Sequence, residues 1–287
     1  MNRICFYIVI INVFYCANIF AAEKLNVFVS ILPQKYFVEQ VGKELVDVQV
    51  MIGPGQNPTT YEPTPRQMVQ ISKAKIYFSI GVPFENAWLP KVRKNNKNLV
   101  IVDCCESLID TSITPHQASE HDVFHSDPHI WSSPIKVIQL VEQITEQLVA
   151  IDTSNTELYR KSATVFIQKL LELDSEIKTK TKGLIKRDLI VSHPSWSYFA
   201  REYGFVQIPI EQNGKEIQAS AMVHLIEDAK QKKIKAVFVQ PQFNNKAAEV
   251  IAQEIGAKLI MLDPLAMDYI ANMQEVTEKI VEGLSYE

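Results

Sequence analysis

Short apolar runs alternate with amphipathic stretches along most of the chain. Runs rich in β-branched residues predict strands, and the amphipathic stretches between them predict helices. Strands are expected at 25–31, 47–52, 76–81 and 99–103, and again near 188–192, 205–210, 235–240 and 258–262. Helices are expected at 34–42, 65–74 and 84–95, and later at 196–203, 219–232, 245–255 and 270–284. Because strands separated by helices form helix-covered parallel sheets, the pattern predicts an α/β fold of two lobes, each with a four-stranded, mainly parallel sheet.

The two sets of elements resemble each other. Residues 65–81 (PRQMVQISKAKIYFSIG) and 219–240 (ASAMVHLIEDAKQKKIKAVFVQ) each contain a Met-Val pair in a helical pattern, a Lys-rich turn and a strand. This weak self-similarity favours an internal duplication.

A long amphipathic segment, 155–182, contains neither Gly nor Pro and lies between the two sets. Ser154 or Asn155 can cap its start, and Gly183 can end it. Spacings of four and three place its apolar or small residues on one stripe: Tyr159, Ala163, Phe166, Leu170, Leu173 and Ile177. We expect a rigid helix about 42 Å long that joins the lobes. A coiled-coil dimer is the competing interpretation.

The first residues have the order of a secretory signal peptide. A positive start precedes the apolar stretch 4–20, and cleavage is expected after Ala21. A retained membrane anchor is the alternative, although the stretch is barely long enough to span a bilayer. Lipid anchoring on Cys16 is disfavoured because Tyr15 is bulky where a small residue is expected. The expected divisions are 1–21 signal peptide, 22–153 N-terminal lobe, 154–184 connecting helix and 185–287 C-terminal lobe, with a periplasmic product.

Composition and motifs argue against a disordered chain, a nucleic-acid-binding protein and an enzyme. A hydrophobic fraction of 47% and a charged fraction of 22% are ordinary for a folded globular protein. A formal net charge of −4 provides no basic field for nucleic acid. The chain has no H-E-x-x-H motif and no nucleophile elbow, so we expect it not to be an enzyme.

Two adjacent cysteines, Cys104 and Cys105, remain after removal of the leader. In an oxidising compartment they could form a strained vicinal disulfide. We favour two small buried apolar side chains at a strand end.

Polar residues with metal-binding chemistry follow the predicted strands or lie in turns. His129 belongs to an Asp-Pro-His turn, His193 follows one strand, and Asp263 follows another. Two imidazoles and a carboxylate form a site suited to zinc, manganese or iron, and ligands of open parallel sheets bind outside the carboxyl ends of the strands. Each residue also has a structural explanation, because Asp before Pro is common in turns and a histidine can serve as a hydrogen-bonding core residue.

Five segments together resemble a known family, that of the periplasmic proteins and lipoproteins that supply zinc and manganese to ABC importers. They occur in the family's order over nearly the whole mature chain: YEPTPRQM (61–68), IGVPFENAWLPK (80–91), DPHIWSSP (127–134), SHPSWSYFAREYGF (192–205) and LDPLAMDYIANM (262–273). The resemblance implies two α/β lobes joined by a long rigid helix, in agreement with the pattern above.

The resemblance also implies a ligand set. His129, His193 and Asp263 match the family's second, third and fourth ligands. Thr59 stands where the family has its first ligand, a histidine, and a neutral hydroxyl is a poor zinc ligand. Water, Glu62 or His125 can take the vacant position, or the site has lost transition-metal binding.

The same family comparison draws attention to other residues. His116, His121 and His125 form a thin version of a His-rich loop, which either binds metal weakly or is only a solvated connection. Glu211 and Glu216 lie where the family has acidic residues, and either can orient a ligand imidazole.

The expected function is capture of a divalent transition metal, zinc rather than manganese, and its delivery to the membrane permease of an ABC importer. Metal affinity should fall below about pH 6.5 as the histidines protonate. The alternative is a binding protein for a metal chelate or an organic ligand, its metal site degraded at Thr59; a zinc hydrolase and an adhesin are further alternatives. We expect a monomer. The sequence leaves the identity of the metal and of the permease open.

Overall fold

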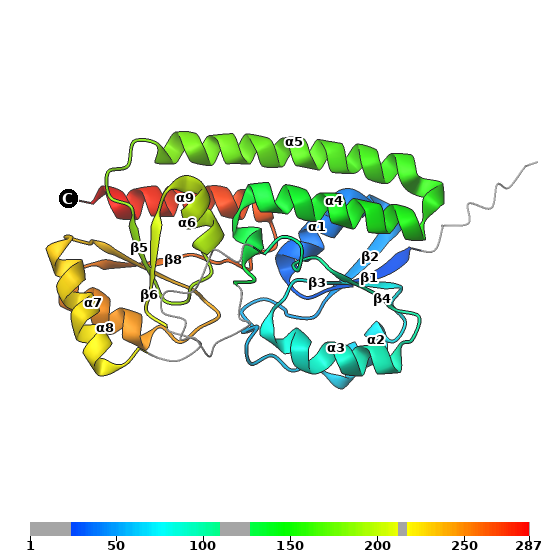
Figure 1. The fold of residues 1–287 in the computed structure, drawn as a ribbon, viewed down its shortest axis with the longest axis horizontal. Coiled ribbons are helices and arrows are strands. Elements are labelled where there is room, and N and C mark those ends of the chain that lie inside the picture. The colour runs from blue at the N-terminus through cyan, green and yellow to red at the C-terminus, as the bar shows by residue number, and fades with distance from the viewer. Residues whose placement is uncertain (1–23, 110–126, 212–216, 287) are drawn as a thin grey trace, which may run out of the picture.

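Two four-stranded parallel sheets lie side by side, and one long helix, α5 (Thr156–Thr181), runs along both of them (Figure 1). The structure is a computed structural model that describes residues 24–109, 127–211 and 217–286. The expected leader, the three loop histidines and Glu216 therefore lie outside the described residues.

The first sheet and its helices are built from the N-terminal half of the chain. Its strands are β1 (Leu25–Val29), β2 (Val46–Val50), β3 (Ile76–Ser79) and β4 (Val100–Asp103). Its helices are α1 (Leu32–Gly42), α2 (Pro65–Ile71), α3 (Pro83–Asn95) and α4 (Pro134–Ile151), with 3-10 turns at Lys43–Leu45, Ile130–Ser132 and Thr153–Asn155.

The second sheet follows α5 (Thr156–Thr181). Its strands are β5 (Asp188–Val191), β6 (Val206–Pro209), β7 (Ala236–Val239) and β8 (Lys258–Met261). Its helices are α6 (Ser197–Tyr203), α7 (Ala219–Gln231), α8 (Lys246–Ile255) and α9 (Tyr269–Ser285).

The two sheets have the same topology. Their strand orders are β2-β1-β3-β4 and β6-β5-β7-β8, and every pairing is parallel. The two similar sequence segments occupy equivalent positions, because α2 precedes β3 as α7 precedes β7. The expected α/β fold with two parallel four-stranded sheets is confirmed, and the topology supports the duplication.

The stripe of apolar residues on α5 is buried within the chain. This helix has 26 residues, which corresponds to about 39 Å. Its six stripe residues are all buried, and the helix contacts α1 and α4 of the first lobe and α9 of the second. Since these intramolecular contacts cover the stripe, it offers no seam to a coiled-coil partner.

A continuous hydrophobic core extends across both lobes. Phe37 on α1 contacts Phe166 on α5 and Tyr269 on α9, with ring centroids 6.2 and 5.0 Å apart, respectively. A separate, smaller cluster around Ile190, Val237 and Ile251 lies beneath α7 and α8. The lobes are therefore joined by shared packing as well as by α5.

Several strands end one or two residues earlier than predicted. β1 ends at Val29 rather than at 31, and β3 ends at Ser79 rather than at 81. After β3 the backbone turns at Gly81, where φ is 83°, a conformation that glycine adopts without steric cost. The residues predicted as strand ends instead lead into the following helices, with Ile31 as the N-cap of α1 and Gly81 just before α3.

Cys104 and Cys105 directly follow β4, and both thiols are free and buried. The interpretation as small buried apolar side chains is confirmed. Within the part of the chain that the structure describes, no helix has the length and apolar character needed to cross a bilayer.

Candidate metal centre

The candidate centre lies between the carboxyl ends of the two sheets. His193 follows β5 by two residues, Asp263 follows β8 by two residues, and His129 directly precedes the 3-10 turn Ile130–Ser132. Parallel strands present their carboxyl ends at one edge of a sheet. Two lobes that face each other in this way can bring residues from distant parts of the sequence together.

His129 and His193 lie beside each other in one small pocket. Their ring centroids are 5.3 Å apart, and the rings are inclined by 75°. Both line a pocket of about 80 Å³. Eight of its ten other wall residues are apolar or aromatic: Pro58, Val82, Pro83, Pro128, Trp131, Phe243, Pro264 and Leu265. Water therefore has few hydrogen-bonding partners around the two imidazoles.

Each imidazole is bound through Nδ1 to a carboxylate. Nδ1 of His129 lies 2.6 Å from Oδ1 of Asp127, and Nδ1 of His193 lies 2.9 Å from Oε2 of Glu211. A proton shared at Nδ1 leaves the Nε2 lone pair available to a metal. The structure thus confirms the predicted contact between Glu211 and a candidate ligand, and adds Asp127 as its counterpart.

Burial and neighbouring charges control the protonation of His193 and Asp127. Burial lowers the pKa of His193, and the nearby Glu211 offsets only part of this effect. Burial alone would raise the pKa of Asp127, but the attraction and hydrogen bonds of His129 hold it below its ordinary value. The result is a neutral imidazole at His193 and an ionised carboxylate at Asp127, which are the forms that support metal binding.

Aromatic rings fix the planes of both imidazoles. Phe243 stacks on His193 with ring centroids 4.0 Å apart and an interplanar angle of 15°. Trp131 lies against His129, with centroids 5.1 Å apart. Each histidine is therefore held at Nδ1 by a carboxylate and on its ring by an aromatic neighbour.

Asp263 is adjacent to the pocket in sequence, but its side chain does not line the pocket with the two histidines. Its Oδ1 accepts hydrogen bonds from Nε2 of Gln242 at 2.6 Å and from the backbone N–H of Leu265 at 2.9 Å. Among residues 24–109, 127–211 and 217–286, no three His, Cys, Asp or Glu side chains are grouped closely enough to hold a metal ion. The structure brings together two of the three predicted ligands.

Thr59 lines the pocket from the N-terminal lobe, whereas His193 lines it from the C-terminal lobe. Its backbone N–H donates to Oδ1 of Asn57 at 2.8 Å, and its hydroxyl donates to the same oxygen. Glu62, one of the candidate replacements, is exposed and does not line the pocket. The other candidate, His125, lies outside the described residues.

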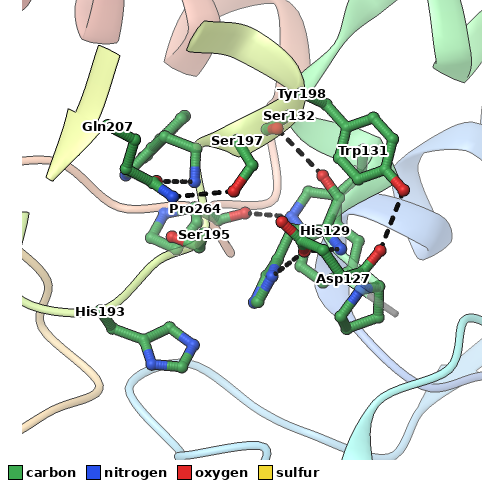
Figure 2. A network of polar contacts seen from close by, with 12 residues as sticks. Asp127, His129, Trp131, Ser132, His193, Ser195, Ser197, Tyr198, Gln207 and Pro264 are labelled. Atoms are coloured by element: carbon green, nitrogen blue, oxygen red, sulfur yellow. Dashed lines mark hydrogen bonds and ion pairs between the residues drawn. The ribbon is translucent and has the colours of Figure 1, made fainter. Parts of the chain in front are cut away.

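The segment that carries His129 is bonded to the second lobe. Nε1 of Trp131 donates to the carbonyl oxygen of Pro264 at 2.9 Å, next to Asp263 in the chain. The hydroxyl of Tyr198 donates to the carbonyl oxygen of Asp127 at 3.0 Å (Figure 2). These bonds hold His129 in a constant position relative to His193.

The buried carboxyl group of Glu85 supports the pocket wall that Val82 and Pro83 form. Glu85 accepts hydrogen bonds from the backbone N–H groups of Ile80, at 2.9 Å, and Gly81, at 2.8 Å, and from the hydroxyl of Ser30. Burial raises the pKa of Glu85 to about 7. The side chain fixes the turn that leads to the wall residues Val82 and Pro83.

Comparison with known proteins identifies the family. The family profile described as "Zinc-uptake complex component A periplasmic" (ZnuA) matches residues 27–283. The chain belongs to this ZnuA family. Its fold agrees with the expectation from the five sequence segments.

Individual relatives support the assignment. The "High-affinity zinc uptake system protein ZnuA" of Bacillus subtilis (strain 168) is 31% identical over 253 residues, which cover 85% of this chain and 79% of the relative. The "Manganese ABC transporter substrate-binding lipoprotein PsaA" of Streptococcus anginosus is 25% identical over 284 residues, covering 92% and 91%. A zinc-bound crystal structure of a ZnuA deletion mutant has a TM-score of 0.84 and 38% identity, covering 92% of this chain and all (100%) of that one.

Sequence reasoning missed two aromatic residues of the centre. Trp131 lay within a recognised segment but had no role in the predicted site, and Phe243 gave no signal. A lone aromatic residue in a loop after a strand is common, and only the fold places Phe243 against His193. Asp127 was noted as a turn residue, although its carboxylate contacts the ring of His129.

Proposed function

We propose that this chain is an extracytoplasmic solute-binding protein that captures a divalent transition metal and delivers it to the membrane permease of an ABC importer. The observation that carries the proposal is the pair His129 and His193, each bound at Nδ1 to a carboxylate, with both rings in one pocket. Such carboxylate–histidine pairs are typical of metal centres, because the carboxylate fixes the tautomer and raises the basicity of the ligand nitrogen.

The proposed protein ligands are Nε2 of His129, Nε2 of His193 and a carboxylate oxygen of Asp263. Binding requires the Asp263 side chain to turn from Gln242 toward the histidines. The fourth ligand is water at the wall formed by Thr59, since a threonine hydroxyl is a poor zinc ligand. The exposure of Glu62 and its position outside the pocket wall argue against it as the replacement.

Zinc is the preferred metal. Two imidazoles, one carboxylate and one water form a four-coordinate set, which zinc accepts, whereas manganese favours six mainly oxygen ligands. A pocket of about 80 Å³ with apolar walls leaves little space for additional water. The same volume disfavours the alternative of an organic ligand or chelate, because pockets for such molecules are several times larger.

Reversible capture also accounts for the absence of enzymatic features from the sequence. The named relatives are an uptake protein and a transporter component, so we assign no catalytic residue. The proposed protein is exported with a leader at 1–21, has lobes at 22–153 and 185–287, and acts as a monomer.

Metal titration tests this function. The mature protein is stripped with a chelator and titrated with zinc and with manganese, in the wild type, His129→Ala and His193→Ala. We expect one tight zinc equivalent in the wild type and its loss in both variants. His224→Ala is the matched control, because His224 is a 79% exposed histidine on α7. Tight zinc binding that survives both substitutions, or no tight binding by the wild type, would contradict the proposal.

A further inference from the structure

Phe243 separates two cavities of different character. It lies between β7 and α8 and lines both the metal pocket and a neighbouring cavity of about 200 Å³. Among the described residues that line these cavities, Phe243 alone faces both. Its ring covers one face of His193 at a centroid distance of 4.0 Å.

The neighbouring cavity has the features that retain water. Its walls are mixed: Asn57, Glu211 and Asn244 are polar, whereas Ile210, Ile217, Ala247 and Ala248 are apolar. Ser192 also lines it, is only 7% exposed, and has a buried hydroxyl with no hydrogen-bonding partner in the described structure. A cavity of this size with several polar groups can hold ordered water. The metal pocket on the other side of Phe243 is smaller and mostly apolar.

The ring of Phe243 therefore blocks the direct path by which water in the neighbouring cavity could reach a metal in the metal pocket. Zinc is stable with four ligands, whereas manganese demands more oxygen ligands and usually retains water. A barrier to additional water thus lowers the affinity for manganese more than the affinity for zinc.

We propose that Phe243 is a specificity-determining residue. It limits a bound metal to four ligands by separating the metal pocket from the neighbouring water-holding cavity, and so favours zinc over manganese. The inference rests on the proposed metal capture and adds to it the reason for the choice of metal. Phe243 is not itself a ligand, and it acts by excluding the fifth and sixth ligands.

Cobalt(II) spectroscopy tests the ligand number directly. Four-coordinate cobalt(II) absorbs visible light much more strongly than six-coordinate cobalt(II). The wild type should therefore give intense visible bands. Phe243→Ala should weaken these bands and should lower the ratio of zinc to manganese affinity by about tenfold or more, because water enters from the neighbouring cavity. Phe243→Leu, which keeps an apolar barrier without an aromatic ring, should retain most of both properties.

Three results would overturn the inference. One is a six-coordinate cobalt spectrum in the wild type, which requires no variant to fold. The second is an unchanged spectrum and an unchanged affinity ratio in Phe243→Ala. The third is an equal loss in Phe243→Leu and Phe243→Ala, which would assign the effect to ring stacking on His193. A wild type that binds neither cobalt nor zinc would instead refute metal capture itself, and the inference with it.

Discussion

Nδ1 of His193 lies 2.9 Å from Oε2 of Glu211, and this contact has a counterpart at His129, whose Nδ1 lies 2.6 Å from Oδ1 of Asp127. The two carboxylates come from different lobes of the chain. Asp127 is only two residues from its histidine, whereas Glu211 is 18 residues from His193. Two unrelated local structures thus produce the same tautomer at both candidate ligands.

Removal of the Glu211 carboxylate should weaken metal binding. In Glu211→Ala, His193 loses its Nδ1 partner and can rotate or change tautomer. The loss in zinc affinity should be about 10- to 100-fold. In Glu211→Gln the amide oxygen can still accept the Nδ1 proton, so the loss should be smaller. Competition with a chromophoric chelator measures both affinities.

A carboxylate outside the centre provides the control for this prediction. Glu227 on α7 is 62% exposed, and Glu227→Ala removes the same charge without touching the pocket. Zinc affinity should remain unchanged in this variant. Equal affinities for Glu211→Ala and the wild type would show that the Glu211 carboxylate does not support metal binding by His193.

Trp131→Phe should destabilise the protein and weaken zinc binding. Trp131 is 2% exposed and donates across the lobes to the carbonyl oxygen of Pro264. Loss of this bond leaves a buried carbonyl unpaired, which costs about 1–3 kcal/mol of unfolding free energy. Zinc affinity should fall as well, because Pro264 adjoins the proposed ligand Asp263. Urea unfolding and zinc titration measure the two effects.

Trp88→Phe is the matched substitution on the first lobe. Trp88 is partly exposed on α3, where Lys91 Nζ lies 3.9 Å from its ring centroid. Its replacement should change the unfolding free energy by no more than about 0.5 kcal/mol. If Trp131→Phe behaved in the same way, the cross-lobe bond would not contribute to stability.

The sequence was sufficient for the elements and for two members of the site. Short apolar runs and helical patterns located the strands and helices to within one or two residues for most elements, because the central strands are buried on both faces and the helices bury one stripe. The α5 stripe is an example, since Tyr159, Phe166 and Ile177 are all buried as the spacing predicted. The strand-end rule then placed His193, whereas His129 was found from its Asp-Pro-His turn and the family resemblance.

Contacts between distant segments could not be predicted in the same way. Trp131 and Pro264 are 133 residues apart, and no local pattern records that their segments touch. Phe243 acquires its role only because the loop after β7 places it against His193. The orientation of the Asp263 side chain also depends on a neighbour, because Nε2 of Gln242 donates a hydrogen bond to its Oδ1. The contribution of Asp263 to the site therefore stays a prediction.

Glu85 should make the stability of the protein dependent on pH. Burial raises its pKa from 4.5 to about 7, so the folded state retains a proton that the unfolded state releases. The free energy of unfolding should therefore fall as pH rises from about 4.5 to about 7 and then level off. With about 1.4 kcal/mol per tenfold change in proton affinity, the loss is on the order of 3 kcal/mol.

Glu85→Gln isolates this contribution, because the amide does not titrate. Urea unfolding of the wild type and the variant at about pH 5 and about pH 8 should show a larger decrease for the wild type. Other titrating groups affect both proteins equally and cancel in the comparison. Identical decreases would mean that Glu85 has the same pKa in the folded and unfolded states.

Metal binding should cause little movement of the lobes. The two halves share α5, which contacts α1 and α4 on one side and α9 on the other, and a continuous core surrounds these helices. A hinge motion would have to break this core, whereas flexible connections between domains bend freely. Small-angle scattering of the metal-free and zinc-bound protein should therefore give radii of gyration that agree within about 1 Å. A larger compaction would show that the lobes close as separate bodies, and that α5 bends or releases α9 when zinc binds.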